Sequence, residues 1–410
     1  MKNIGGNLER LKLKNRQLIL RLLNDKGSMS RKFIAQAISL TSASISQLCS
    51  EMIAEGLIIE IGESINTTKA GRKEILININ YENRYAICIN VEKFSTTITL
   101  LDLIGNVIFF KKVKTEIYIE SYIFLKKLAQ ICQTFLQDNT FISGKIIGVG
   151  VTLRGLVNKE RGISLHSYEI WDREVAVKEI LESLLPFPVI VENNLRAFAQ
   201  AEMIYGIGKN YCNLVFLKWF PGVGSSLVID QSVYEGSNGL AGELAHYLVE
   251  ENGIRCTCGK RGCLETLISF EAIVNNINLI YSKSMTPILY TSTNGEKSNI
   301  SMFLRNCLKN NITNLDEYVF EILDKAIQTL ALHTFNAVTF MAPQKLIVYG
   351  DFFAYDYIYN KFIESYKSYS TDWNEDLIFR SKLSNKISYI GALAIVVEQF
   401  FFKVGGTIIN

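Results

Sequence analysis

Residues 239–265 read GLAGELAHYLVEENGIRCTCGKRGCLE, and they hold one of the three histidines and three of the eight cysteines of the chain. The residues with metal-binding side chains, separated by nine, one and four positions, are His246, Cys256, Cys258 and Cys263. Three thiolates and one imidazole complete the tetrahedral shell that Zn²⁺ prefers and leave no open position for water or substrate. The spacing therefore predicts a structural zinc site, and the alternative is an adventitious cysteine-rich turn.

The composition is that of a globular protein. Apolar residues make up 48% and charged residues 20% of the 410 residues, which excludes wholesale disorder and low-complexity architectures. This length predicts two or three domains. The mean hydropathy is +0.15, but the richest apolar run, 389–397, is shorter than the roughly 18 residues that span a bilayer. Because residues 1–6 lack the apolar stretch of a secretory signal, we expect a cytoplasmic protein without membrane contact.

The other five cysteines are predicted to have no metal-binding role. In a chain without a secretory signal, a free thiol is more common than a disulfide. Buried free thiols are expected because apolar residues surround these positions, which are Cys49, Cys88, Cys132, Cys212 and Cys307.

Charge is distributed unevenly along the chain. Residues 1–75 contain twelve Lys and Arg and seven Asp and Glu, which gives a net charge of +5. The rest of the chain carries −2, since the whole chain carries +3. A small basic head on a slightly acidic body suggests a nucleic-acid-binding module, and the alternative is a solubilising surface.

The N-terminal region has the pattern of a helix-turn-helix. Apolar positions at helical spacing predict one helix from Leu8 to Asn24 and a second helix with Ser30 as its N-cap. A tight turn at 39–41 leads to a third helix at about 42–55. In such modules the second helix of the pair enters the major groove of DNA. The small polar side chains early in this third helix are the predicted DNA contacts: Ser42, Ser44, Ser46 and Gln47.

A β-hairpin wing is predicted after these helices. Its strands are expected at 56–62 and 75–79, and the loop between them is polar. The basic residues of the tip, which can contact phosphates or the minor groove, are Lys69, Arg72 and Lys73. The sequence therefore predicts a winged helix-turn-helix DNA-binding domain at residues 1–80.

From residue 81 the pattern becomes that of an α/β body. Buried strands alternate with helices, and a second set of strands starts near residue 214, which suggests two similar lobes facing across a cleft. We expect one lobe at about 81–200 plus the C-terminal helix and the other at about 201–390. Strands are predicted at 86–91, 96–102, 106–112, 146–151, 189–191, 214–219, 226–229 and 345–349, and helices at 121–137, at 175–185 and after Gly391.

Two stretches of this body resemble the signature of the ROK family (repressors, open reading frames and kinases). These are 239–265, quoted above, and the strand-end motif Val-Ile-Val-Glu-Asn-Asn at 189–194. The resemblance covers about residue 85 to the C-terminus. It implies the two-lobed actin-like ATPase (ribonuclease H-like) fold and a zinc ion at the cysteine cluster. The preceding winged helix is a feature of the repressor branch, the xylose- and N-acetylglucosamine-type sugar-operon repressors.

The resemblance also implies residues that bind a sugar effector. The positions that match those holding sugar hydroxyls in the family are Asn193, Asn194, Glu243, His246 and Glu265. The alternative for Glu243 and Glu265 is a hydrogen bond to loop backbone alone. Arg196 stands where the family has a small or amide residue, so we expect it to fill the cleft or to recruit an acidic ligand.

Several positions depart from the kinase branch of the family. Asn194 replaces the aspartate that takes the proton from the sugar hydroxyl, and an amide cannot act as that base. Residues 90–95, NVEKFS, replace an Asp-x-Gly-Gly-Thr-Lys phosphate turn. The second phosphate turn, at 220–225, is partly preserved, and aromatic residues replace a glycine-rich turn near 350–353. We therefore expect a protein that is not an enzyme.

The sequence as a whole predicts a transcriptional repressor of carbohydrate-metabolism genes. It would bind a palindromic operator as a homodimer or a dimer of dimers, and a sugar would act as its effector. Two alternatives remain open. One is an active ROK sugar kinase with a DNA-binding head, and the other is a DNA-binding protein regulated by a protein partner.

Overall fold

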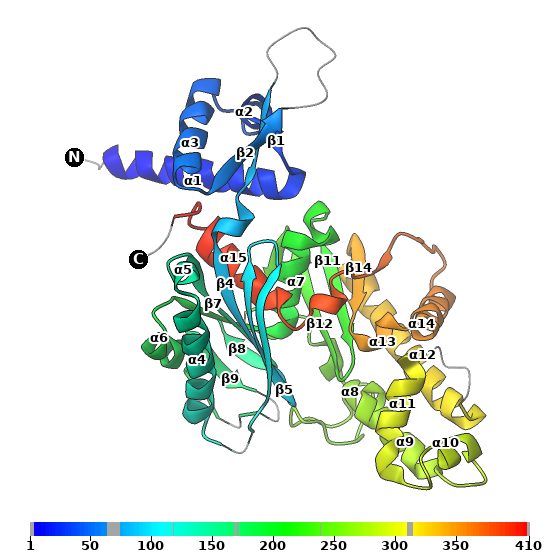
Figure 1. The fold of residues 1–410 in the computed structure, drawn as a ribbon. Helices are drawn as coiled ribbons and strands as arrows, with labels where there is room; N and C mark the ends of the chain where they lie inside the picture. The colour runs from blue at the N-terminus through cyan, green and yellow to red at the C-terminus, as the bar shows by residue number, and fades with distance from the viewer. Residues whose placement is uncertain are drawn as a thin grey trace. The chain divides into compact units, whose positions relative to one another are not determined.

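The chain forms two compact units, which are Met1–Tyr205 together with Ser388–Asn410, and Gly206–Ile387 (Figure 1). None of the helices in the described part of the chain is long and apolar enough to cross a membrane. The computed structural model describes residues 4–63, 74–117, 119–167, 170–171, 173–237, 239–309 and 315–407.

The first unit begins with a head in which α2 and α3 form the predicted helix-turn-helix. Ser30 caps α2 by accepting a hydrogen bond from the backbone N–H of Phe33 at 3.4 Å, as the sequence predicts. Thr41 caps α3 in the same way, because its hydroxyl accepts the N–H of Ser44 at 3.2 Å. The helices of the head are α1 (Ile4–Lys26), α2 (Arg31–Ala37) and α3 (Ser42–Ala54).

A small antiparallel sheet completes the head. Its strand order is β1-β3-β2, with β1 at Met29–Ser30, β2 at Ile58–Glu63 and β3 at Ile75–Ile79. The two strands of the predicted wing are therefore confirmed, and the two-residue strand β1 adds a third that the sequence did not indicate. The predicted tip residues Lys69, Arg72 and Lys73 lie outside the described residues.

The rest of the first unit is built on a five-stranded sheet with the order β10-β7-β4-β5-β6. Strands β4, β7 and β10 are parallel, and β5 and β6 are antiparallel to their neighbours. Its elements are η1 (Tyr81–Asn83), β4 (Tyr85–Val91), β5 (Ser95–Asp102), β6 (Val107–Lys114), α4 (Ser121–Asp138), α5 (Thr140–Ser143), β7 (Ile146–Leu153), β8 (Leu156–Asn158), β9 (Ile163–His166), α6 (Val177–Leu184), β10 (Val189–Asn193), α7 (Asn194–Tyr205), α15 (Ile390–Val397) and η6 (Glu398–Phe402).

Helices cover both faces of this sheet. On one face α4 and α6 pack on the strands, where Phe124 and Leu181 join a buried cluster with Ile89. On the other face lies α15, the helix near the C-terminus. Gly150 of β7 allows its close approach, since a Cβ at this position would lie 2.3 Å from the carbonyl oxygen of Ala392. The apolar run at 389–397 is thus a buried helix of the first unit.

The second unit contains another five-stranded sheet, with the order β13-β12-β11-β14-β15. A large apolar cluster joins one face of this sheet to the surrounding helices, with Leu217, Leu330 and Phe362 fully buried within it. Its elements are η2 (Ile207–Asn210), β11 (Leu214–Trp219), β12 (Val223–Ile229), β13 (Ser232–Tyr234), η3 (Leu244–His246), α8 (Glu265–Ile268), α9 (Phe270–Ile280), α10 (Pro287–Ser292), η4 (Lys297–Asn299), α11 (Ile300–Lys309), α12 (Glu317–Met341), β14 (Lys345–Tyr349), α13 (Asp351–Ala354), α14 (Asp356–Tyr369), β15 (Ile378–Arg380) and η5 (Ser384–Lys386).

The two large sheets share one topology. In each, the first three strands form an antiparallel meander, and two later strands add in parallel on the side of the first strand. This repeat confirms the α/β fold of two similar lobes that the sequence predicts. It also explains why strand patterns start again near residue 214, since each lobe begins with its own meander.

Four of the five cysteines outside the cluster are buried or half-buried. Cys49, Cys88 and Cys132 are buried, as predicted, and Cys307 is half-buried. The prediction is wrong for Cys212, which is exposed. Cys212 lies in the turn before β11, and its backbone N–H donates to the side chain of Gln344, which precedes β14. This contact fixes the backbone of the turn without burying the thiol.

A buried ion network lies behind the end of β10. The carboxylate of Glu192, 1% exposed, accepts a hydrogen bond from Nε of Arg196 at 2.8 Å and forms an ion pair with Nζ of Lys159 at 2.9 Å. Burial raises the pKa of Glu192, but the charges of Lys159 and Arg196 outweigh burial and hold the pKa below its usual value. Glu192 is therefore ionised in the folded protein and ties the β8–β9 hairpin to the start of α7.

Replacing this carboxylate should destabilise the first unit. Glu192→Gln leaves the buried guanidinium of Arg196 and the half-buried ammonium of Lys159 without their counter-ion, which costs about 3–5 kcal/mol. Glu160 lies in the same hairpin and is exposed, so Glu160→Gln should cost less than about 0.5 kcal/mol. Since the pKa of Glu192 is lowered by folding, its contribution is present above the ordinary value of 4.5 and is lost as the pH falls through its lower folded value. Denaturant unfolding at pH 7 and pH 3 measures both effects. Equal stability of the two variants would contradict the assignment.

Candidate DNA-binding face, metal centre and effector residues

The predicted DNA-contacting residues of α3 form one exposed face. Ser42, Ser44, Ser46 and Gln47 are all exposed. The opposite face of the helix is buried in the head, where Ile45, Cys49 and Met52 are fully covered. The hydroxyl of Thr41 holds the first turn of α3 through Ser44, and sequence analysis did not assign this capping role, although threonine before an amphipathic helix is a common N-cap. The face offers hydroxyl and amide groups of the kind that contact base edges and phosphates.

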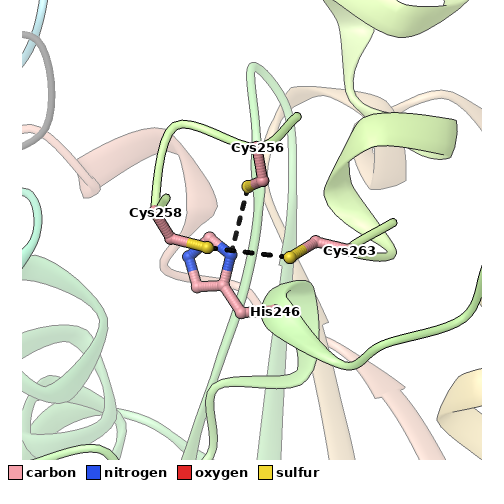
Figure 2. Close-up of side chains that lie close together, drawn as sticks. All are labelled: His246, Cys256, Cys258 and Cys263. Carbon is pink, nitrogen blue, oxygen red and sulfur yellow. Dashed lines mark hydrogen bonds between the residues drawn. The ribbon is translucent and has the colours of Figure 1, made fainter. Parts of the chain in front are cut away.

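The predicted metal ligands lie together in the second unit. His246 ends the short helix η3, and the cysteines lie on the loop that follows it and returns toward α8. Hydrogen bonds between backbone groups close this loop. The N–H of Val249 donates to the carbonyl oxygen of Gly262, and the N–H of Cys256 donates to the carbonyl oxygen of Lys260 at 2.8 Å. Figure 2 shows the imidazole and the three thiols converging on one point.

The distances within this cluster fit a tetrahedral metal site. The four candidate ligand atoms lie within 4.8 Å of one another. Nδ1 of His246 is 3.6 Å from Sγ of Cys256, and Sγ of Cys258 is 3.6 Å from Sγ of Cys263 (Figure 2). Two sulfurs bound tetrahedrally to Zn²⁺ at about 2.3 Å are separated by about 3.8 Å. The His/Cys cluster could therefore bind a metal ion with little movement of its side chains.

The ionisation of these thiols also depends on their surroundings. Burial raises the pKa of Cys256, and burial together with the thiol of Cys258 raises the pKa of Cys263 to about 12. Without a cation these thiols hold their protons at neutral pH. A bound metal ion would displace the protons and supply the positive charge that the thiolates need.

Two glutamates flank the imidazole of the cluster. Oε2 of Glu243 lies 3.9 Å from Nε2 of His246, and Oε2 of Glu265 lies 4.0 Å from Nδ1. The side chain of Glu243 is 31% exposed and that of Glu265 is 13% exposed. Since Nδ1 faces the thiols, Nε2 lies on the side of Glu243, at a distance longer than that of a hydrogen bond. The second unit thus brings together three of the five predicted effector residues.

The other two predicted effector residues lie in the first unit, where both side chains make hydrogen bonds. Oδ1 of Asn193 accepts the backbone N–H groups of Leu195 and Arg196 at 2.8 and 3.2 Å, which caps α7. Its Nδ2 donates to the carbonyl of Gly155 at 2.8 Å. Nδ2 of Asn194 donates to Oε1 of Glu92 at 2.8 Å. Glu92 stands in the stretch that the resemblance matches to a phosphate turn of the kinases. It is therefore a partner of Asn194, which is expected to replace a catalytic aspartate.

Arg196 does not behave as predicted. The sequence led us to expect that it fills the cleft or recruits an acidic ligand, but it is 5% exposed and pairs with Glu192 on the preceding strand. The prediction is wrong because the buried carboxylate of Glu192, four positions earlier, is the partner of the guanidinium. Lys159, from a distant hairpin, pairs with the same carboxylate, and a sequence motif cannot reveal this arrangement.

Aromatic rings gather where the second unit has its altered turns. The ring of Phe220 lies 5.1 Å from Phe270 and 5.0 Å from Phe352, and the guanidinium of Arg305 lies 5.0 Å from the centroids of both Phe220 and Phe270. Phe220 has a φ of 97°, a region that favours glycine. The backbone thus keeps the conformation of a glycine turn while its side chain joins an aromatic cluster with Trp219 and Phe352.

Comparison with known proteins relates the whole chain to one family. A family model described as "ROK family" matches residues 86–399. A putative xylose repressor of Caldicellulosiruptor sp. (strain Rt8B.4) is 25% identical over 396 residues, covering 96% of this chain and 98% of the relative. The DNA-binding transcriptional dual regulator NagC of Escherichia coli K12 is 28% identical over 406 residues, covering 95% of this chain and 94% of the relative.

Solved structures agree with the fold. The crystal structure of a ROK family transcriptional regulator, a homolog of the E. coli MLC protein, has a TM-score of 0.78 at 23% identity and covers 96% of this chain and 98% of that chain. A ROK family glucokinase from Streptomyces griseus has a TM-score of 0.65 at 18% identity and covers 76% of this chain and 98% of that chain. The regulator thus matches a larger share of this chain than the kinase does.

Proposed function

Because the chain belongs to the ROK family, we propose that it is a DNA-binding transcriptional regulator, a repressor of carbohydrate-metabolism genes. The observation that carries this proposal is the head that precedes the family region. Its helix-turn-helix, wing strands and exposed polar face on α3 support a DNA-binding domain at residues 1–80 followed by a ROK body at 81–410. The names of the relatives, xylose repressor and NagC, support the same function.

The proposed DNA contacts combine base reading with phosphate binding. Ser42, Ser44, Ser46 and Gln47 would face the major groove from α3, and Lys69, Arg72 and Lys73 of the wing would add positive charge. The net charge of +5 on residues 1–75 supports this interface. A palindromic operator bound by a homodimer or a dimer of dimers is the arrangement that we propose.

The proposed effector is a sugar, and its binding groups are Asn193, Asn194, Glu243, His246 and Glu265. Carboxylates and amides are suited to hydroxyl-rich ligands because they accept and donate several directed hydrogen bonds. A ligand of this kind regulates DNA binding if it binds one conformation of the body more tightly than another. Such a cytoplasmic sensor must bind its sugar but does not need to catalyse a reaction of the sugar.

The amide at the base position argues against phosphoryl transfer to a sugar. Asn194 cannot accept a proton from an attacking hydroxyl, and its Nδ2 already donates to Glu92. The carboxylate of Glu92 adds negative charge within the turn that holds phosphate in the kinases, which disfavours a polyphosphate. The first unit therefore supports binding of a neutral sugar without transfer of phosphate.

The aromatic cluster of the second unit also argues against a nucleotide. In the kinases glycines allow the backbone of these turns to approach phosphate. Here Phe220, Phe270 and Phe352 pack against one another, and Arg305 stacks on two of the rings. The side chains of Phe352 and Phe353 are both fully buried. We therefore propose that the protein is not an enzyme.

The His/Cys cluster is proposed to hold a structural Zn²⁺ through His246, Cys256, Cys258 and Cys263. Three thiolates and an imidazole form a closed donor set, which suits zinc and leaves no place for a substrate. When bound, the ion supplies positive charge and a fixed geometry. The loop residues then hold Glu243 and Glu265 on either side of the imidazole, so the metal would position two proposed effector groups.

The wing can be tested through the salt dependence of DNA binding. A duplex ligand is first selected from a random library with the full chain. Arg72→Ala combined with Lys73→Ala should weaken binding and lower the slope of log affinity against log salt by about 0.9 for each phosphate that is no longer neutralised. The matched control, Lys111→Ala with Lys112→Ala on exposed positions of β6, should leave the slope unchanged. An unaltered slope in the wing variant would count against the assignment.

The zinc proposal predicts a measurable metal content. Elemental analysis of the purified protein should find about one zinc ion per chain. Cys258→Ser should lose the ion and lower the melting temperature, because the binding energy of a structural metal contributes to folding. Cys212→Ser, which alters an exposed thiol outside the cluster, should retain the metal. A metal-free protein with unaltered stability in Cys258→Ser would refute the site.

Sugar binding and phosphoryl transfer can be separated in one set of assays. Hexoses, pentoses and N-acetylhexosamines are screened for an increase in melting temperature, where a saturating ligand should give about 2–4 °C. Glu243→Gln should abolish the shift and Glu251→Gln, exposed in the same loop, should keep it. No sugar should be phosphorylated with ATP. Turnover at an ordinary rate would restore the kinase alternative, and the absence of any shift would favour regulation by a protein partner.

A further inference from the structure

The longest helix of the head has three faces, and two of them are occupied. One face of α1 (Ile4–Lys26) enters the core of the head, where Ile19, Leu20 and Leu23 are fully buried. A second face meets the C-terminal segment: Gln17 donates to the carbonyl of Lys403 at 2.5 Å, and Arg21 pairs with Glu398 at 2.7 Å. Both faces thus have partners within the first unit.

The third face carries a stripe of apolar side chains that are exposed. Leu8 is 73% exposed, Leu11 is 57% exposed and Leu18 is 39% exposed. Positions separated alternately by three and four residues line one side of a helix. We define the α1 stripe as Leu8, Leu11, Asn15, Leu18 and Leu22, of which Asn15 and Leu22 are half-buried. In Figure 1 the N-terminal end of α1 extends beyond α2 and α3, so the first turns of the stripe project from the head.

The spacing of the α1 stripe is that of a helix-pairing seam. Alternate intervals of three and four residues place apolar side chains at the a and d positions of a heptad, which insert between those of a second helix. Scattered single leucines are normal on protein surfaces, but three aligned and exposed leucines on one helix face form a continuous patch. A helix therefore fits the stripe better than a flat surface does.

Asn15 at the centre of the stripe identifies the partner helix. An asparagine side chain both donates and accepts hydrogen bonds, so it is complementary to a second asparagine. A wholly apolar partner would leave the amide without a hydrogen bond, at the cost of a desolvated polar group. A single asparagine at an a position is also known to specify how identical helices pair. The self-complementary partner is a second copy of this helix.

We propose that the α1 stripe pairs with the α1 stripe of a second copy and thereby joins two heads into one DNA-binding unit. About two heptads are too short for a stable isolated pair, so this contact adds to others that hold two copies together, as in any multivalent assembly. The purpose of the pairing rests on the proposed DNA-binding function, whereas the pairing itself does not. It fixes the distance between two recognition helices, which a palindrome with constant half-site spacing requires.

Cysteine crosslinking of the full-length protein tests the pairing without DNA. In a Cys212→Ser background, Asn15→Cys places a thiol in the centre of the stripe, and Glu9→Cys places one at an exposed position on another face of α1. A short bismaleimide should give about tenfold more covalent dimer for Asn15→Cys than for Glu9→Cys, because pairing raises the effective concentration of the central thiols. Equal yields, or no dimer from either variant, would overturn the proposal.

A charge within the stripe provides a second test that distinguishes pairing from folding. Leu11→Glu should abolish the Asn15→Cys crosslink and lower the affinity for a selected palindromic duplex by about tenfold or more. The melting temperature should not change, because Leu11 is 57% exposed. Leu279→Glu, at a leucine that is 84% exposed on α9, should leave both crosslinking and affinity unaltered. A crosslink that survives Leu11→Glu would also overturn the pairing.

The two tests separate this inference from the proposed function. If no duplex is selected from the library but Asn15→Cys crosslinks, then the DNA-binding function fails and the pairing stands. If a palindrome is selected but Asn15→Cys does not crosslink, then the protein binds DNA and its heads are not joined through α1.

Discussion

The close packing of α15 on β7 is the constraint on which the first unit depends. Gly148 and Gly150 leave no room for a side chain, since a Cβ on Gly150 would lie 2.3 Å from a carbonyl of the helix. This approach places the C-terminal segment beside the core sheet and next to the head. From there Gly405 accepts a hydrogen bond from the buried Arg16, whose guanidinium also pairs with Glu55 at the end of α3. The close approach of α15 to Gly150 thus positions the C-terminal segment, which in turn contacts the head through Arg16.

The body combines a kinase-like backbone with side chains of a different chemistry. The fold with two five-stranded sheets is similar to that of a solved ROK family glucokinase. In the first unit an amide and a glutamate, Asn194 and Glu92, bond to each other at the strand ends. In the second unit Phe220 keeps a backbone angle suited to glycine while its ring joins an aromatic cluster. Side chains, and not the fold, separate the proposed sensor from an enzyme.

Strands and caps could be predicted from the sequence because their signals are local. The ranges of β3, β11 and β14 follow from short apolar runs between turns, and Ser30 was recognised as a cap from its position before a helix. The four residues of the proposed metal site can be identified from the sequence because their spacing within eighteen positions is itself the signal. Helix α7 gave no periodicity, since most of its faces are buried. The Glu192 network could not be predicted because Lys159 lies far away in sequence and meets Glu192 only in the folded chain.

The return of the chain end to the first unit has a consequence for biosynthesis. A ribosome completes all of the second unit before it releases α15 and the turn at Gly405, which contact β7 and α1. The sheet that carries the Asn193 motif therefore lacks α15 on one face while the whole of the second unit is synthesised. The head acquires its contacts with the C-terminal segment only after α15 and the turn at Gly405 have emerged. Incomplete chains that end before residue 388 would carry the proposed DNA-contacting helix α3 without the segment that contacts the head through Arg16.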